Sequence, residues 1–97
     1  MIEHIVFLKF KPETTRAQKE EAIKRLHELK HKVSGIVDLQ ANFNFADLSK
    51  GYEVGLTVRF ESMDVFEQYG PSPEHQECLA FLNKIGVEDK IIVDFEI

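Results

Sequence analysis

Four segments of the chain alternate apolar and polar residues with a period of two, and this pattern constrains the fold more than any other feature. The segments are 2–10, 37–45, 52–60 and 91–97. Each is rich in β-branched or aromatic residues, which is typical of strands. The side chains expected on the core face are Ile2, His4, Val6, Leu8 and Phe10; Val37, Leu39, Ala41, Phe43 and Phe45; Tyr52, Val54, Leu56, Val58 and Phe60; and Ile91, Val93, Phe95 and Ile97.

Helical patterns separate the first strand from the second and the third from the fourth. After the first strand, Thr15 and Gln18 fit a capping box, and apolar residues then recur at helical spacing. Two shorter helices, capped by Ser62 and Ser72, fill the interval before the last strand. The order strand, helix, strand, strand, helix pair, strand predicts a ferredoxin-like α+β fold, βαββ(αα)β, with an antiparallel sheet and all helices on one face.

Size, charge and cysteine content exclude several classes of protein. The 97 residues suffice for one domain spanning 1–97, and 43% of them are apolar, as in ordinary globular domains. A net charge of −5 without a basic patch argues against nucleic-acid binding. No run approaches the roughly 18 apolar residues of a membrane span, and the first residues lack a signal-peptide pattern. The one cysteine, Cys78, cannot form an internal disulfide, so we expect a cytoplasmic protein.

The face of the sheet opposite the helices is expected to have an uncovered apolar patch. Ile5 and Phe7 of the first strand and Ile92 of the last are assigned to this face. The first strand is central in this topology, and exposed apolar patches usually mark an interface. We therefore expect a homodimer, with a two-fold axis and the two sheets facing each other as a barrel. The alternative is a monomer whose open face tolerates a few apolar residues.

Residues 27–31 read H-E-x-x-H, the pattern of zinc proteases. That chemistry needs both histidines on one inward face and a third ligand. At about 100° per residue, His27 and His31 lie well off the apolar stripe of Leu26 and Val33 and face solvent. We therefore expect a polar helix face, with no side-chain metal site and no cofactor. One alternative stays open, namely that backbone carbonyls at the end of this helix hold a metal ion.

Two histidines and a tyrosine are expected to meet in the layer between sheet and helices. His75 lies in the first turn of the last helix, on its buried stripe, where the helix dipole and burial favour a neutral imidazole that can accept a proton. His4 lies on the covered strand face, and Tyr69 points into the same layer with a hydroxyl that needs a partner. Together they predict a polar pocket in an apolar layer. Alternatively, each of these three side chains simply packs in the core. Cys78 is expected to be a small buried hydrophobe.

Several segments together resemble the stress-responsive dimeric α/β-barrel (Dabb) family. In chain order they are His4 to Lys11, Gly51-Tyr52, Phe60-Glu61-Ser62, Tyr69, Pro73-Glu74-His75-Gln76 and Val93-Asp94-Phe95-Glu96. The resemblance covers nearly the whole chain and implies a ferredoxin-like protomer and a homodimeric barrel.

One branch of the family, a plant polyketide cyclase, uses a pocket between helices and sheet. Its functional residues match His4, Tyr69 and His75. A further histidine of that enzyme falls at Val54, and Ser72-Pro73 replaces the family's usual His-Pro.

If the pocket is catalytic, the resemblance implies proton transfer. His75 would act as base on a carbon next to a carbonyl, Tyr69 would fix the base or donate to the oxygen, and His4 would hold or polarise the carbonyl. The expected apolar wall for an acyl or aromatic ligand consists of Val6, Leu8, Ile23, Leu26 and Val54. Two alternatives stay open: a non-catalytic structural or interaction module with a filled layer, and a cofactor-less monooxygenase.

Overall fold

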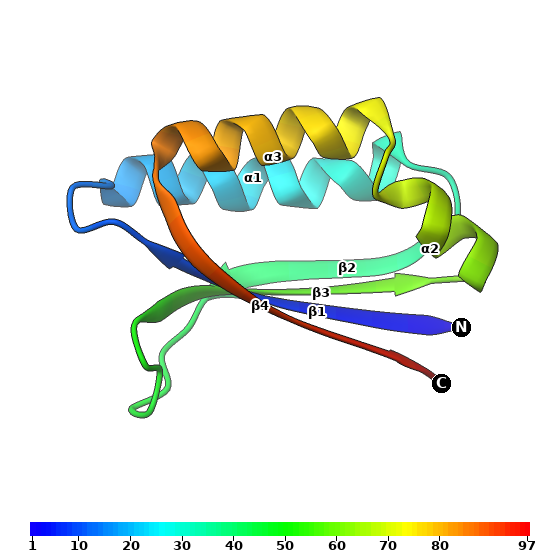
Figure 1. Cartoon of the computed structure of the whole chain (residues 1–97), viewed down its shortest axis with the longest axis horizontal. Coiled ribbons are helices and arrows are strands. Elements are labelled where there is room, and N and C mark those ends of the chain that lie inside the picture. Colours follow the sequence, from blue (N-terminus) through cyan, green and yellow to red (C-terminus); the bar gives the residue numbers. More distant parts are fainter.

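The computed structural model describes all residues, 1–97, as one four-stranded sheet covered on one face by helices (Figure 1). The strands pair antiparallel in the order β2-β3-β1-β4. This arrangement confirms the predicted ferredoxin-like α+β fold. The elements are β1 (Ile2–Phe10), α1 (Arg16–Lys32), β2 (Ile36–Phe43), β3 (Tyr52–Phe60), α2 (Met63–Tyr69), α3 (Pro73–Ile85) and β4 (Val87–Glu96).

Local chemistry sets the ends of the helices. At the start of α1, the Thr15 side chain accepts a hydrogen bond from the Gln18 backbone at 3.2 Å, and the Gln18 side chain accepts one from the Thr15 backbone at 2.9 Å. Ser62 and Ser72 cap α2 and α3 in the same way. Gly86 ends α3 with φ 112°, and a Cβ there would lie 2.6 Å from the Thr14 hydroxyl. Glycine is therefore required at this turn into β4.

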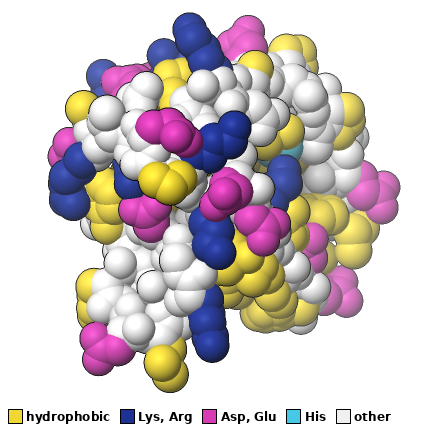
Figure 2. Space-filling view, turned by 60° about the vertical axis from the view of Figure 1, so that its left-hand side comes forward, with side chains coloured by type: hydrophobic (Ala, Val, Ile, Leu, Met, Phe, Trp, Pro, Cys, Tyr) yellow, Lys and Arg dark blue, Asp and Glu magenta, His cyan; other side chains and the backbone are white.

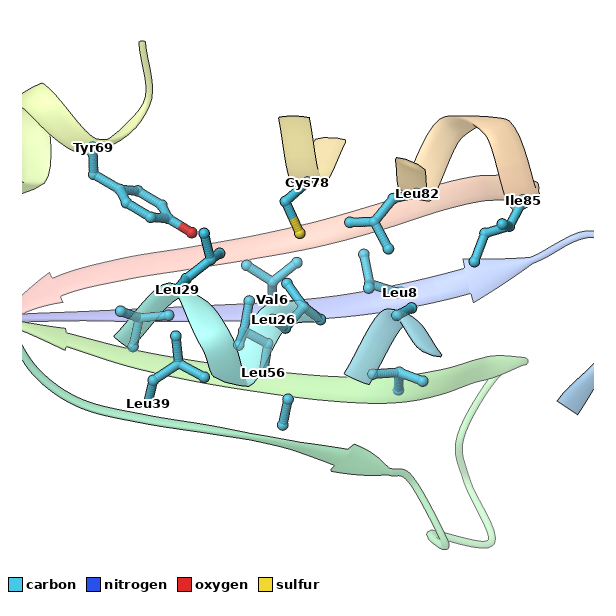
Figure 3. Close-up of a cluster of buried hydrophobic side chains, with 14 of the residues drawn as sticks. Val6, Leu8, Leu26, Leu29, Leu39, Leu56, Tyr69, Cys78, Leu82 and Ile85 are labelled. Atoms are coloured by element: carbon cyan, nitrogen blue, oxygen red, sulfur yellow. The ribbon is translucent and has the colours of Figure 1, made fainter. Parts of the chain in front are cut away.

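The core lies between the sheet and the α1–α3 layer (Figure 3). Alternate residues of β1 and β3 point into it, and Phe60, Val54 and Val58 are almost completely buried. Leu26 and Leu29 of α1 meet this face. The core residues on α3 are Cys78, Leu82 and Ile85. None of the three helices has the length and apolar content of a membrane span.

The structure corrects the core positions expected in β2. Val37 is 46% exposed because the pairing with β3 skips it: Ile36 pairs with Phe60 and Asp38 with Arg59. Phe45 is 99% exposed because β2 ends at Phe43 and the chain turns into the β2–β3 hairpin.

A similar irregularity moves Tyr52 away from its expected place on the core face. β1 and β3 shift register after Leu8, so that Lys9 pairs with Tyr52. The Tyr52 ring consequently packs against Phe7, with centroids 6.5 Å apart, and its hydroxyl donates to Asp89 at 2.7 Å.

The face assignment of β4 was wrong. Val6 pairs with Ile92 and Leu8 with Lys90, so Ile92 points toward the helices rather than toward the open face. The residues expected in the core, Ile91, Val93 and Phe95, lie on the open face and are 42% to 46% exposed; Ile97 is exposed too. The period of two was right, but it does not say which face of an edge strand meets the core.

Candidate binding and catalytic pocket

A cavity of about 500 Å³ lies between the sheet and the helices, on the side of β1 and β4. Its walls are mostly apolar: Val6, Leu8 and Leu56 come from the sheet, Leu26 from α1, and Leu79 and Leu82 from α3. Figure 2 shows a histidine recessed among hydrophobic side chains, with a cationic side chain beside it. A cavity of this size and lining suits a small organic ligand.

His4 enters this cavity from β1 and is paired with a carboxylate. Asp94 faces His4 across the β1–β4 ladder, and its carboxylate accepts a hydrogen bond from Nδ1 of His4. Because a carboxylate only accepts, Nδ1 carries the hydrogen and Nε2 of the neutral ring is an acceptor. The rings of Phe60, Phe66 and Tyr69 surround the imidazole, with centroids 5.8 to 6.2 Å away. His4 is therefore held in one orientation and one tautomer.

His75 enters from the first turn of α3. Its Nδ1 donates to the carbonyl oxygen of Gly70 at 2.9 Å, which leaves Nε2 as the free acceptor. Burial lowers the pKa of His75 below its usual value. The bond to Gly70 opposes this shift, and the positive charge of Lys90, or of His4 when it is protonated, adds to it. The ring lies against that of Tyr69, with centroids 4.2 Å apart. At neutral pH, His75 is a neutral base beside a phenol.

Tyr69 is 4% exposed, yet its hydroxyl makes no hydrogen bond within the protein. No fully buried side-chain polar atom lacks a partner, so this hydroxyl is open to the cavity. Figure 3 shows it directed toward the cluster around Val6 and Cys78. Burial raises the pKa of Tyr69, and the Cys78 thiol adds to the shift. The phenol therefore stays protonated and can donate a hydrogen bond to a ligand.

The structure brings His4, Tyr69 and His75 together at this one cavity, while their roles stay a prediction. Three of the residues expected in the apolar wall, Val6, Leu8 and Leu26, also line it. Ile23 and Val54 do not: both pack in or against the core outside the cavity.

Sequence reasoning missed Asp94, Lys90 and Ile92, which line the cavity from β4. The pairing register between β1 and β4 would have identified them, but this register cannot be read from a single sequence. Ile92 was expected to point away from the helices, Lys90 lay outside the strand predicted for 91–97, and Asp94 was given no role.

The H-E-x-x-H segment forms no side-chain metal site in the structure. His27 and His31 are exposed on α1, as expected. Nε2 of His27 lies 2.8 Å from the carbonyl oxygen of Ala41 at the free edge of β2. No group of three or more His, Cys, Asp or Glu side chains is arranged to hold a metal ion.

The fold and the pocket define a class: small ferredoxin-like α+β proteins with a cavity between the sheet and its helices. Within that class, the family model of the Stress responsive A/B Barrel Domain (Dabb) matches residues 2–97, and the chain belongs to this family. Olivetolic acid cyclase from Cannabis sativa is 33% identical over 76 residues, which cover 76% of this chain and 75% of the cyclase.

Two solved structures are similar throughout their length. A dimeric protein of unknown function and ferredoxin-like fold from Bacteroides fragilis has a TM-score of 0.80 at 23% identity, covering 99% of this chain and 95% of that one. Hydroxynitrile lyase from Passiflora edulis has a TM-score of 0.87 at 18% identity, covering 99% and 92%. At these identities the likeness establishes the fold.

Proposed function

We propose that this protein binds a small apolar or aromatic carbonyl compound in the cavity and transfers a proton on it. The observation that supports this most is the contact between Tyr69 and His75. An unpartnered phenol hydroxyl and a neutral imidazole lie side by side in a cavity whose walls are mostly apolar. A packed core would satisfy or exclude both groups, whereas a reaction site leaves them free for a ligand.

In the proposed reaction, His75 is the base. Its free Nε2 takes a proton from a carbon next to the ligand's carbonyl group, which leaves an imidazolium and an enolate. The Tyr69 hydroxyl donates a hydrogen bond to the developing enolate oxygen. The enolate can then attack a second carbonyl group of the same molecule, or take back a proton from the imidazolium.

His4 has a supporting role, with Asp94 as its positioning residue. In the neutral ring Nε2 is an acceptor, so His4 polarises a carbonyl oxygen only after taking up a proton. The adjoining Asp94 carboxylate balances the charge of that imidazolium. Carbonyl chemistry of this kind is in keeping with a cyclase among the relatives.

Deuterium uptake by a β-polyketone in heavy water, followed by NMR, tests the proposal. We expect His75→Ala to slow uptake by about 10²- to 10⁴-fold, the usual contribution of a general base. His31→Ala, which removes an exposed histidine of α1, is the matched control and should exchange at the wild-type rate. Equal rates in the two variants would refute the role of His75.

We also propose that two copies associate through their open sheet faces. Phe7, Ile91, Val93 and Phe95 form an uncovered apolar patch there, together with the half-buried Ile5. Ile92 is removed from the expected interface, and the three apolar residues of β4 take its place. Three of the similar solved structures are described as dimeric, which supports a homodimer. We keep the cytoplasm as the proposed location, since Cys78 is free.

A further inference from the structure

One ammonium group at the cavity has no partner in the protein. Lys90 pairs with Leu8 across the β1–β4 ladder, which directs its side chain to the helix-covered side, and it lines the cavity together with His75. The ion pairs of the protein join other residues, and the Lys90 side chain makes no hydrogen bond.

The two carboxylates of β4 that line the cavity are already engaged. Asp94 accepts from His4. Asp89 accepts from the Tyr52 hydroxyl at 2.7 Å and from the Lys90 backbone at 2.9 Å. The bond from Tyr52 is the main reason that the pKa of Asp89 lies below its usual value. The third carboxylate of the lining, Glu67, belongs to α2 and forms no ion pair with Lys90.

We propose that Lys90 is a specificity residue that pairs with an anionic group of the ligand, so that the cavity prefers an apolar carboxylate to the corresponding neutral compound. The inference rests on the proposed binding function of the cavity and names the chemical class of its ligand. An ammonium beside apolar walls binds a carboxylate better than the same charge in open water, because fewer water molecules compete for it.

The position of Lys90 also sets where the anionic group lies. Lys90 comes four residues before Asp94 on β4, which is roughly 13 Å of extended backbone at about 3.3 Å per residue. The ligand's anionic end is therefore held at one end of the cavity while its other end reaches toward His4 and Asp94. An elongated apolar acid matches this arrangement better than a compact one.

Octanoate and 1-octanol are suitable probes, because they share an apolar chain and differ in charge. Lys90 is exposed to solvent at the edge of the cavity, so titration calorimetry of the wild-type protein should give a dissociation constant only about three- to fivefold lower for octanoate, within the range of an exposed ion pair. Raising the salt concentration should reduce that preference. Lys90→Met should abolish it and leave the affinity for octanol unchanged, whereas Lys90→Arg should retain it.

Lys84→Met is the matched control, since Lys84 is exposed on α3 and does not line the cavity. This variant should prefer octanoate as the wild type does. Equal affinities for the two probes in the wild type, or a preference that survives in Lys90→Met, would overturn the role of Lys90 and leave the cavity as a binding site. If the wild type bound neither probe, the proposed binding function would fall as well.

Discussion

His4 and Asp94 are separated by 90 positions in the chain but lie directly opposite each other on β1 and β4, joined by a hydrogen bond from Nδ1 of His4 to the Asp94 carboxylate. The central strand thus positions the imidazole, and the edge strand determines its tautomer. The relationship also indicates which face of β4 meets the helices. It explains why the cavity has a charged rim although its walls are apolar.

Replacing Asp94 by Ala should destabilise the fold as well as the site. Nδ1 of the buried His4 would lose its acceptor, and leaving such a donor unpaired costs about 1–3 kcal/mol. Urea unfolding measures the loss, and the nitrogen chemical shifts of His4 report the tautomer. Glu96 lies on the same strand but is exposed, so Glu96→Ala should change neither the free energy of unfolding nor the chemical shifts of His4 by much. An unchanged His4 spectrum in Asp94→Ala would contradict the hydrogen bond.

Tyr69→Phe should separate reactivity from stability. The hydroxyl has no hydrogen-bond partner in the protein, so its removal should leave the urea midpoint close to that of the wild type. Deuterium uptake by the β-polyketone should nevertheless fall about 10²-fold, as expected for the loss of one donor to a developing oxyanion. The comparison is Tyr52→Phe, which loses a surface bond to Asp89 and should keep its exchange rate. Full activity in Tyr69→Phe would exclude the phenol as a donor.

The pH dependence of exchange should follow His75. Only its neutral form accepts a proton, so the rate should rise with pH and level off. Because burial lowers the pKa of His75, the midpoint should lie below about 6.5, the value of an ordinary histidine. The expected measurement is the rate between pH 4 and 8, alongside the NMR titration of His75. A midpoint at or above the ordinary value would contradict the assigned burial.

The lowered pKa of His75 also makes the stability of the fold depend on pH. A histidine whose pKa is lower in the folded state binds protons more readily when unfolded. His75 therefore contributes stability that is fully present above about pH 6.5 and is lost as the pH falls toward its lowered folded pKa. His75→Gln should reduce this part of the pH dependence of the free energy of unfolding. An identical profile in wild type and variant would show that other groups cause it.

Phe7→Glu should dissociate the proposed dimer. Phe7 lies on the open face between Gly55 of β3 and Ile91 of β4, so a carboxylate there would be buried against apolar side chains of the second copy. Light scattering should give the mass of one chain for the variant and of two for the wild type. Lys24→Glu, the corresponding change on the exposed side of α1, should remain dimeric. An unaltered mass in Phe7→Glu would count against this interface.

Periodicity predicted most of the covered layer correctly. The helical spacing of His75, Cys78 and Leu82 placed them on the inward side of α3, and the alternation of β1 placed His4 opposite them. The predicted face was wrong for β4, for Val37 and Phe45 of the second segment, and for Tyr52 at the start of β3. In β2 a skipped residue interrupts the alternation, and in β4 the apolar side is the open one. Neither a skipped residue nor the identity of the covered face has a local signal in a single sequence.

By itself, the sequence determined the order of helices and strands, the caps that begin the helices, and the family to which the chain belongs. These depend on periodicity and on short-range hydrogen bonds between neighbours in the chain. Only the tertiary structure decided that Asp94 holds His4, that Lys90 has no partner, and that the hydroxyl of Tyr69 is open to a cavity. Such contacts join residues far apart in the chain. They depend on the register of the β1–β4 ladder and on how the helices pack.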